Sequence, residues 1–484
     1  MPGGKLSRML SAANRRLALV GVAMLAATIA FSLLENHAAV SRNFALQEIT
    51  AWAGLAIFAS LYWRGWAEIN RRDENALRVV IAIAAILGIA GVMLPAFDSP
   101  DIYAYANMGW MQYRYHLNPY AHLIREASGW QHDPMLAGGW QDVAMPYGFL
   151  FTHLTRLMAM LGDGNLSVTL ILFRLTNALA CVAIAAMLYT IARRTALTRP
   201  EVVLYLFLWN PIVPLEFLAN GHNDILAGMF VVAAIYSAAN ERWLFVIPAL
   251  AAGVLVKYTP ALIVPLALIY VFRRAGWLRA ASSIGVATVL CIVVAIPYLG
   301  GPSTAQSIAA LREQLQTMCS FPQLSAILSW EAARALSVPV RIALLNHIFE
   351  AVFMLGFAVV YFLVLHDTVG DPGAGAGKLL RESVLLFFVF ICVARGKYEP
   401  WYMGVFLPIA ILLPACDWLL SVTIALSFSA MFTFSYLVVN TLVVDALMIV
   451  VLPILWVCIP RWREVAAAIA APGGCHDQEQ EERV

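Results

Sequence analysis

Residues 97–120, FDSPDIYAYANMGWMQYRYHLNPY, are the stretch around which the chain is organised. They follow the apolar segment Leu77–Ala96 and carry two carboxylates, Asp98 and Asp101, three residues apart. That spacing places both carboxylates on one face of a helix. Ser99-Pro100-Asp101 is typical of a helix start, and the Tyr and Trp residues that follow predict a short helix lying in a membrane interface.

Two interpretations of the acids stay open. In the first, they only cap the helix, since Ser, Asp and Pro are the usual residues at a helix start. In the second, a carboxylate held beside hydrocarbon acts as a general base. Desolvation then raises the pKa of Asp101, and Asp98 raises it further by like-charge repulsion or shares a metal with it. Asp101 is the first candidate base and Asp98 the second.

The composition predicts an all-α polytopic membrane protein. The chain has 484 residues, of which 62% are hydrophobic and 12% charged, whereas soluble domains have about 25% charged residues. The seven cysteines form no C-x-x-C pair, and there is no Walker A motif. This pattern indicates no zinc site, no nucleotide-binding domain and no cofactor. We expect membrane lipids as neighbours and no nucleic-acid partner.

Fourteen apolar segments are candidate spans, and because several are shorter than the roughly 20 residues that a crossing needs, we expect twelve to fourteen. They are Leu17–Leu34, Phe44–Trp63, Leu77–Phe97, Leu166–Ile191, Glu201–Leu218, Ile225–Ala239, Trp243–Val256, Pro260–Phe272, Leu278–Tyr298, Ile342–His366, Ser383–Val393, Trp401–Pro414, Trp418–Val439 and Leu442–Ile459. We expect a single transmembrane domain over residues 1–460, with a long loop over 98–165, and a disordered tail over 461–484.

The placement of Lys and Arg predicts the orientation. If the N-terminus is cytoplasmic and the chain crosses fourteen times, most basic residues fall inside, which agrees with the positive-inside rule. Both termini are then cytoplasmic. The loop 98–165 and the turns near residues 220, 257 and 395 all lie outside. Because the polar constellations gather on one face, the pattern favours an enzyme over a transporter, which would place them near the midplane.

Two of these turns carry cations. Lys257 stands between two apolar runs, and it either snorkels to the interface or binds a lipid-linked phosphate. Residues 395–402, RGKYEPWY, either anchor the chain at the interface or form an anion clamp through Arg395 and Lys397.

A third turn, residues 220–224 (NGHND), either caps the helix that follows or binds sugar hydroxyls through His222 and Asp224. The segment MPYGFL, residues 145–150, leads into an amphipathic run, Phe151–Leu161. That run is too short to span a bilayer and predicts a second interfacial helix.

Taken in order, these motifs resemble the GT-C superfamily of membrane glycosyltransferases, and most of all the bacterial polyprenol-phosphate-mannose-dependent α-mannosyltransferases. The matching residues are Asp101-Ile-Tyr103-Ala-Tyr105, Gly109, Asn118-Pro119-Tyr120, Tyr147-Gly148, Trp209-Asn210-Pro211, Gly221-His222-Asn223-Asp224, Lys257-Tyr258-Thr259-Pro260 and Pro400-Trp401-Tyr402. The chain departs from the resemblance at Phe149, where Pro is common.

The resemblance implies a GT-C fold and a bacterial inner-membrane enzyme with its site on the extracytoplasmic face. The donor is a polyprenyl-phosphate sugar, with mannose favoured among hexoses, and the acceptor is a lipid-linked sugar or a glycan. Asp101 deprotonates the acceptor in an inverting displacement, and Lys257, Arg395 or Lys397 stabilises the departing phosphate. The expected substrate contacts are Tyr103, Tyr105, Asn118, Tyr147, His222, Asp224, Tyr258, Glu399, Trp401 and Tyr402.

Two other functions compete with this one. An O-antigen ligase or polymerase also has many spans and outer loops, but relies on Arg and His rather than on an aspartate in a loop. A lipid or solute transporter would agree with the Pro breaks within the spans. Transporters often show repeated hydropathy halves, and this sequence shows none.

Overall fold

The fold is a bundle of helices. The computed structural model describes residues 11–71, 75–97, 99–137, 139–195, 199–299, 319–371, 373, 375–429 and 447–461. Within these residues the chain forms helices, turns and loops and no β-strand. The predicted all-α class is confirmed. Asp98 and most of the predicted tail, residues 462–484, lie outside the described residues.

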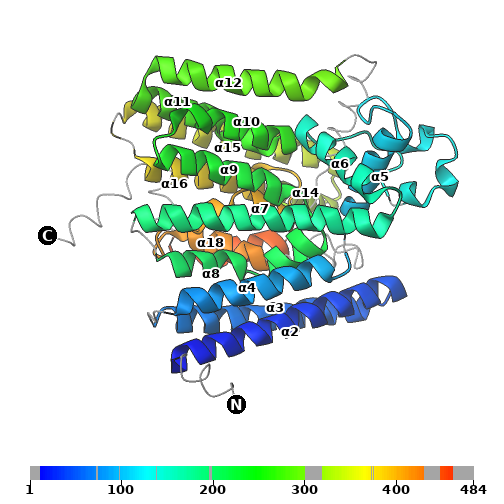
Figure 1. The fold of residues 1–484 in the computed structure, drawn as a ribbon, viewed down its shortest axis with the longest axis horizontal. Helices are drawn as coiled ribbons and strands as arrows, with labels where there is room; N and C mark the ends of the chain where they lie inside the picture. The colour runs from blue at the N-terminus through cyan, green and yellow to red at the C-terminus, as the bar shows by residue number, and fades with distance from the viewer. Residues whose placement is uncertain are drawn as a thin grey trace.

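Six of the described helices are long and apolar enough to cross a membrane. With 18 to 30 residues each and a rise of about 1.5 Å per residue, they reach roughly 27–45 Å. They are α2 (Ala12–Ser41), α3 (Phe44–Ile69), α4 (Ala76–Met93), α7 (Leu166–Thr195), α12 (Trp277–Ala295) and α15 (Ile342–Gly370). Figure 1 shows them side by side with similar axes, as expected of a polytopic membrane protein.

A seventh span is formed only if two helices count as one. α8 (Pro200–Leu208) and η4 (Val213–Ala219) meet at an angle of 58°. Pro211 lies in this break and Pro214 in the first turn of η4, and a proline has no N–H to continue a helix. The predicted span Glu201–Leu218 is therefore broken. The total of six or seven lies below the predicted twelve to fourteen because most of the other expected segments form short helices.

Shorter helices make up the rest of the bundle. They are α9 (Asp224–Ala239), η5 (Trp243–Phe245), α10 (Val246–Val256), η6 (Thr259–Ile263), α11 (Val264–Ala275), α16 (Ala376–Phe388), η8 (Val389–Ala394), η9 (Pro400–Val405), α17 (Leu407–Ala410), α18 (Trp418–Ser427) and α21 (Leu452–Cys458). Several begin at or beside a proline. Broken backbone at membrane depth is tolerated where protein surrounds it, and most side chains of α9 and η9 are buried.

The helix predicted from residues 97–120 exists, but it does not lie exposed on a surface. α5 (Asp101–Arg114) begins one residue after Pro100, and eleven of its fourteen residues are buried. It packs on α6 (Phe149–Gly162), where Gly109 approaches the backbone of Thr155. The short helices η1 (Ile124–Glu126), η2 (Trp130–His132) and η3 (Pro134–Leu136) belong to the same end of the molecule.

Segments far apart in the sequence meet at this end of the bundle. The Phe97 N–H donates to the Asn220 side chain at 3.1 Å, and the Gly148 N–H donates to the Val256 carbonyl at 3.1 Å. The Ser320 hydroxyl donates to the Gly396 carbonyl. The prediction that the loop and the three polar turns share one face is confirmed, while the side of the membrane to which that face belongs stays a prediction.

A close backbone contact holds the interior together and provides the first test. A methyl group on Gly228 of α9 would lie 3.0 Å from the Gly404 carbonyl carbon of η9 and closer still to its oxygen. Gly228→Ala therefore forces the two elements apart, and we expect a clearly lower melting temperature of the detergent-purified protein.

The matched control is Gly356→Ala in α15, where an added methyl group meets no atom within 4 Å. Alanine is favoured over glycine inside a helix by about 1 kcal/mol, so this variant should melt at the same temperature or higher. Equal melting temperatures for the two variants would contradict the close packing of α9 on η9.

Candidate active site

Asp101 stands at the first position of α5 with little solvent exposure. Its backbone N–H donates to the Ser99 hydroxyl at 3.2 Å, and the Tyr105 hydroxyl donates to its carboxylate at 3.4 Å. Asp101 makes no side-chain cap for its own helix. The capping interpretation of this acid is therefore not supported, and the carboxylate is directed toward other side chains.

Behind Asp101 lies a buried histidine. The His222 Nδ1 atom is 3.6 Å from a carboxylate oxygen of Asp101, and its Nε2 atom is 3.4 Å from a carboxylate oxygen of Glu216. At these separations the contacts are ion pairs rather than aligned hydrogen bonds. The His222 ring stacks on Trp401 with a centroid distance of 4.0 Å and an interplanar angle of 9°.

The predicted cation Lys257 lies at the same site. Its ammonium group contacts both carboxylate oxygens of Asp224, at 2.7 and 2.8 Å. It also lies over the rings of Tyr402 and Tyr147, 4.7 and 5.8 Å from their centroids. Lys257 therefore does not snorkel away from the bundle, because Asp224 and two aromatic rings hold it.

The turn that precedes η9 contributes two further cations. The Arg395 guanidinium lies over the Tyr402 ring at 4.7 Å, and the Lys397 ammonium group is 3.1 Å from the Glu399 carboxylate. Because Lys257 also lies on Tyr402, this one ring contacts two cations. All three predicted phosphate-binding cations are thus gathered at one place, each beside an acid or an aromatic ring.

The predicted tyrosines form a connected group next to Asp101. The hydroxyls of Tyr105 and Tyr147 are 3.3 Å apart, and the Tyr258 hydroxyl donates to the Tyr147 carbonyl at 3.2 Å. Trp140, which the sequence did not single out, stacks on Tyr147 at 6.2 Å and 14°. These rings form one group beside the carboxylate, and they come from α5, the segment before α6 and the Lys257 turn.

Asn118 and Tyr103, two further predicted substrate contacts, have other neighbours. The Asn118 side chain accepts from the Tyr120 N–H at 3.0 Å and donates to the Tyr298 carbonyl at 3.4 Å, which makes it a turn-forming residue. Tyr103 is near Arg174, whose guanidinium donates to the Ala219 carbonyl at 3.0 Å. Asp98 lies outside the described residues, so its role stays a prediction.

The expected rise in the pKa of Asp101 is wrong. Burial alone would raise it, but the close contact with His222 and its charge, together with the charge of Lys257, outweigh burial and hold the pKa below its ordinary value. His222 responds in the opposite direction. Its burial disfavours charge, but Asp101 and Glu216 raise its pKa to about 10. At neutral pH the site therefore holds an ionised Asp101 beside a charged imidazolium.

Sequence reasoning missed Glu216 because it lies inside an apolar segment that was counted as a span. The Asn220 side chain donates to its carboxylate at 3.1 Å, and the Glu216 backbone carbonyl accepts from the His222 N–H at 3.1 Å. The only available signal was a carboxylate within a predicted span, which is rare and usually functional.

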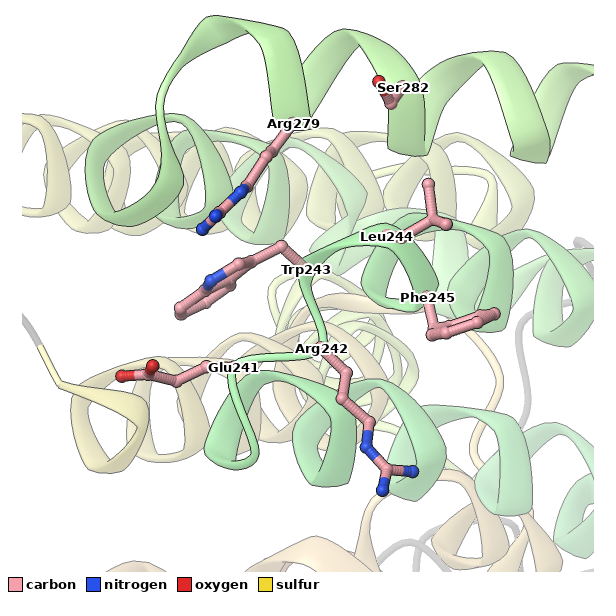
Figure 2. Close-up of a pocket in the computed structure, with 7 residues that line it drawn as sticks. All are labelled: Glu241, Arg242, Trp243, Leu244, Phe245, Arg279 and Ser282. Atoms are coloured by element: carbon pink, nitrogen blue, oxygen red, sulfur yellow. The ribbon is translucent and has the colours of Figure 1, made fainter.

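A separate cavity of about 550 Å³ lies where α9 turns into η5 and α12 begins. Figure 2 shows Arg279 pointing toward Trp243, while Arg242 points away from it. α12 runs from this cavity to the end of the bundle that holds α6 (Figure 1). The cavity therefore lies opposite Asp101, and none of the predicted site residues lines it.

The geometry can support transfer of a group away from a phosphate. An ionised carboxylate can accept a proton, three neighbouring cations can stabilise a phosphate, and stacked aromatic rings suit a sugar face.

Comparison with known proteins agrees with this chemistry. The sequence model of the MptA_B family, described as alpha-(1->6)-mannopyranosyltransferase, N-terminal domain, matches residues 9–273, which is more than half of the chain. The match includes Asp101, His222, Asp224 and Lys257 and ends before the 395–402 turn. No curated protein matches the chain. The resemblance to membrane mannosyltransferases that the motifs indicated is confirmed.

The Lys257–Asp224 pair gives a stability test. The Asp224 side chain is 1% exposed, so Lys257→Met leaves a buried charge without its cation and should cost about 3 kcal/mol. The double variant Lys257→Met/Asp224→Asn should regain most of that loss. Thermal unfolding in detergent measures both.

The control for this pair is Arg125→Met, which removes an ion pair with Asp142 whose two side chains are 57% and 70% exposed. Exposed pairs contribute less than about 1 kcal/mol. If Lys257→Met is as stable as Arg125→Met, the Lys257–Asp224 pair does not hold the site together.

Proposed function

We propose a function for this chain from the premise that it belongs to the MptA_B family, the alpha-(1->6)-mannopyranosyltransferases. The family and the apolar helices make it a membrane mannosyltransferase. The donor is a polyprenyl-phosphate mannose, and the acceptor is a hydroxyl of a lipid-linked sugar or a glycan. The observation that carries this proposal is the buried Asp101 carboxylate, held by His222 and Tyr105, next to a group in which the Lys257 ammonium lies over the rings of Tyr147 and Tyr402.

Asp101 is the general base of the reaction. It takes the proton from the acceptor hydroxyl while that oxygen bonds to C1 of the mannose and the bond from C1 to the phosphate oxygen breaks. Attack from the face opposite the leaving phosphate inverts the configuration at C1. Because the pKa of Asp101 is held below its ordinary value, the carboxylate is ready to accept a proton throughout the neutral range.

Lys257, Arg395 and Lys397 stabilise the departing lipid phosphate, which gains charge as the bond breaks. A contact at about 4 Å with an effective dielectric of about 20 has a Coulomb energy of about 4 kcal/mol. Only the part that grows in the transition state speeds the reaction. In this mechanism the cations supply the electrostatic stabilisation, and no metal ion or cofactor is required.

The aromatic side chains hold the sugar. The candidates are Tyr258, which is 43% exposed, the Tyr105–Tyr147 pair beside Asp101, and Trp401 and Tyr402 of η9. Glu399 is the candidate acceptor of a hydrogen bond from a sugar hydroxyl. Burial raises its pKa, and Lys397 offsets that rise only in part.

The site opens on the extracytoplasmic side of a bacterial inner membrane, where polyprenyl-linked sugars are used. This orientation rests on the bias of Lys and Arg toward the opposite side. Ser128 is exposed at the Asp101 end, and Ser282 is exposed in the cavity at the other end. In a cysteine-free background, Ser128→Cys should react with an impermeant thiol reagent in intact cells, and Ser282→Cys only after permeabilisation. The reverse pattern would place the site in the cytoplasm.

The base is tested by Asp101→Asn, which keeps the shape of the side chain and its contact with Tyr105 but cannot take a proton at neutral pH. We expect turnover with polyprenyl-phosphate mannose to fall by roughly 10²-fold or more, with donor binding close to that of the wild type.

Asp98→Asn is the matched variant three residues upstream, and it should be milder. If Asp98→Asn is inactive while Asp101→Asn is active, the base is Asp98. If both are inactive and a chelator also stops the wild-type reaction, the two acids share a metal ion. A wild-type protein that transfers no sugar from a panel of polyprenyl-phosphate donors would remove the proposed function itself.

A further inference from the structure

We infer that His222 and Glu216 are positioning residues that hold Asp101 as an oriented carboxylate, and that His222 does this as a charged imidazolium rather than as a sugar ligand. This inference deepens the proposed function and rests on it, because it assigns roles behind the base of that reaction.

His222 and Glu216 are both buried. The His222 side chain has no exposed surface, and the Glu216 side chain is 1% exposed. A ring with no exposed surface does not reach a sugar unless its surroundings rearrange. Both ring nitrogens nevertheless face carboxylates, Asp101 on one side and Glu216 on the other, at 3.6 and 3.4 Å. The ring therefore connects the two acids.

The His222 ring is fixed in place. The His222 carbonyl accepts from the Asn177 side chain at 3.0 Å, and its backbone N–H donates to the Glu216 carbonyl. Trp401 covers one face of the ring. Gly221, with a φ of +74°, makes the turn, and a side chain there would collide with Ile102 of α5. The histidine is thus locked against the helix that carries Asp101.

The charge of the His222 imidazole depends on the two acids beside it. A buried imidazole ordinarily stays neutral, because burial disfavours its charged form. Asp101 alone would be one counter-charge, and it is neutralised when it takes the acceptor proton. Glu216 is a second counter-charge that does not take part in the reaction, so it keeps His222 charged through the catalytic cycle. The Asn220 side chain orients the Glu216 carboxylate at 3.1 Å.

Other charged groups lie near Asp101 and His222, and some favour the charged form of a neighbouring carboxylate while others disfavour it. Lys257 and the Ser99 hydroxyl favour the charged form of the Asp101 carboxylate. The charge of Asp101 disfavours that of Glu399, whereas the charge of His222 favours it, so Glu399 is a more distant third counter-charge for the imidazolium. Lys397 feels the charge of Asp101 as well. None of these groups contacts the His222 ring as closely as Asp101, Glu216 and Trp401 do. Removing Glu216 should therefore affect His222 before it affects the other groups.

The direction of each effect follows from the charges. An opposite charge nearby lowers a carboxylate pKa by about one to three units, so losing the imidazolium raises that of Asp101. In His222→Asn we expect the acid limb of the kcat profile to move up by about one pH unit or more, with kcat at neutral pH reduced by roughly tenfold through misalignment. KM for the donor should change little.

Glu216→Gln keeps the shape and the acceptor for Asn220 but removes the charge behind the histidine. The wild-type rate should stay flat up to about pH 10, where His222 loses its proton. In Glu216→Gln the alkaline limb should move to lower pH, because the buried imidazolium has lost one of its two close counter-charges. Glu216→Asp should restore part of the wild-type profile.

The matched control is Glu382→Gln, which removes a carboxylate that is also 1% exposed but pairs with Lys378 near the start of α16. It should leave the pH profile unchanged. If His222→Asn and Glu216→Gln still transfer sugar and keep the acid and alkaline limbs of the wild-type kcat profile, the positioning role is overturned. This holds even if both variants have lower melting temperatures. If Glu216→Gln fails to fold, His222→Asn alone decides through its acid limb. An inactive wild type would instead overturn the proposed function.

Discussion

The site around Asp101 depends on one constraint, which is that the buried charges in it must be paired. Asp101, Glu216 and Asp224 are each largely shielded from water, and each faces a cation from another segment of the chain. An unpaired charge in such surroundings is strongly destabilising, whereas a paired one is held in a fixed place. The same pairing that makes the bundle stable therefore sets the positions of the groups that the proposed reaction uses.

The sequence predicted the parts of the fold that depend on local apolar length. α4, α7, α12 and α15 appear close to their expected bounds, and α2 exists but is longer than predicted, because each has enough consecutive apolar residues to span a bilayer. The interior was harder to predict, since prolines and polar turns divide its apolar runs into pieces. Whether a broken piece forms a span or a short buried helix depends on which neighbours surround it, and a single sequence does not contain that information.

For the site, residue types were predictable and their electrostatics were not. The tyrosines, Lys257 and Asp101 carry recognisable motifs, and the structure brings them together. The pKa of Asp101 had the wrong predicted sign because its main opposing partner, His222, lies 121 positions later in the chain. Glu216 was overlooked because its neighbours in the sequence are apolar, although its carboxylate contacts the buried His222 ring.

The contacts between the 98–165 loop and later segments of the chain have a consequence for how the protein is made. Gly148 bonds to Val256, Tyr147 accepts from Tyr258, and Trp401 covers His222. A nascent chain that has inserted only its first helices thus already contains the carboxylate but lacks the cations and rings that surround it. The site is completed only when the last third of the chain joins the bundle, so insertion intermediates in the membrane are expected to be inert toward lipid-linked sugars.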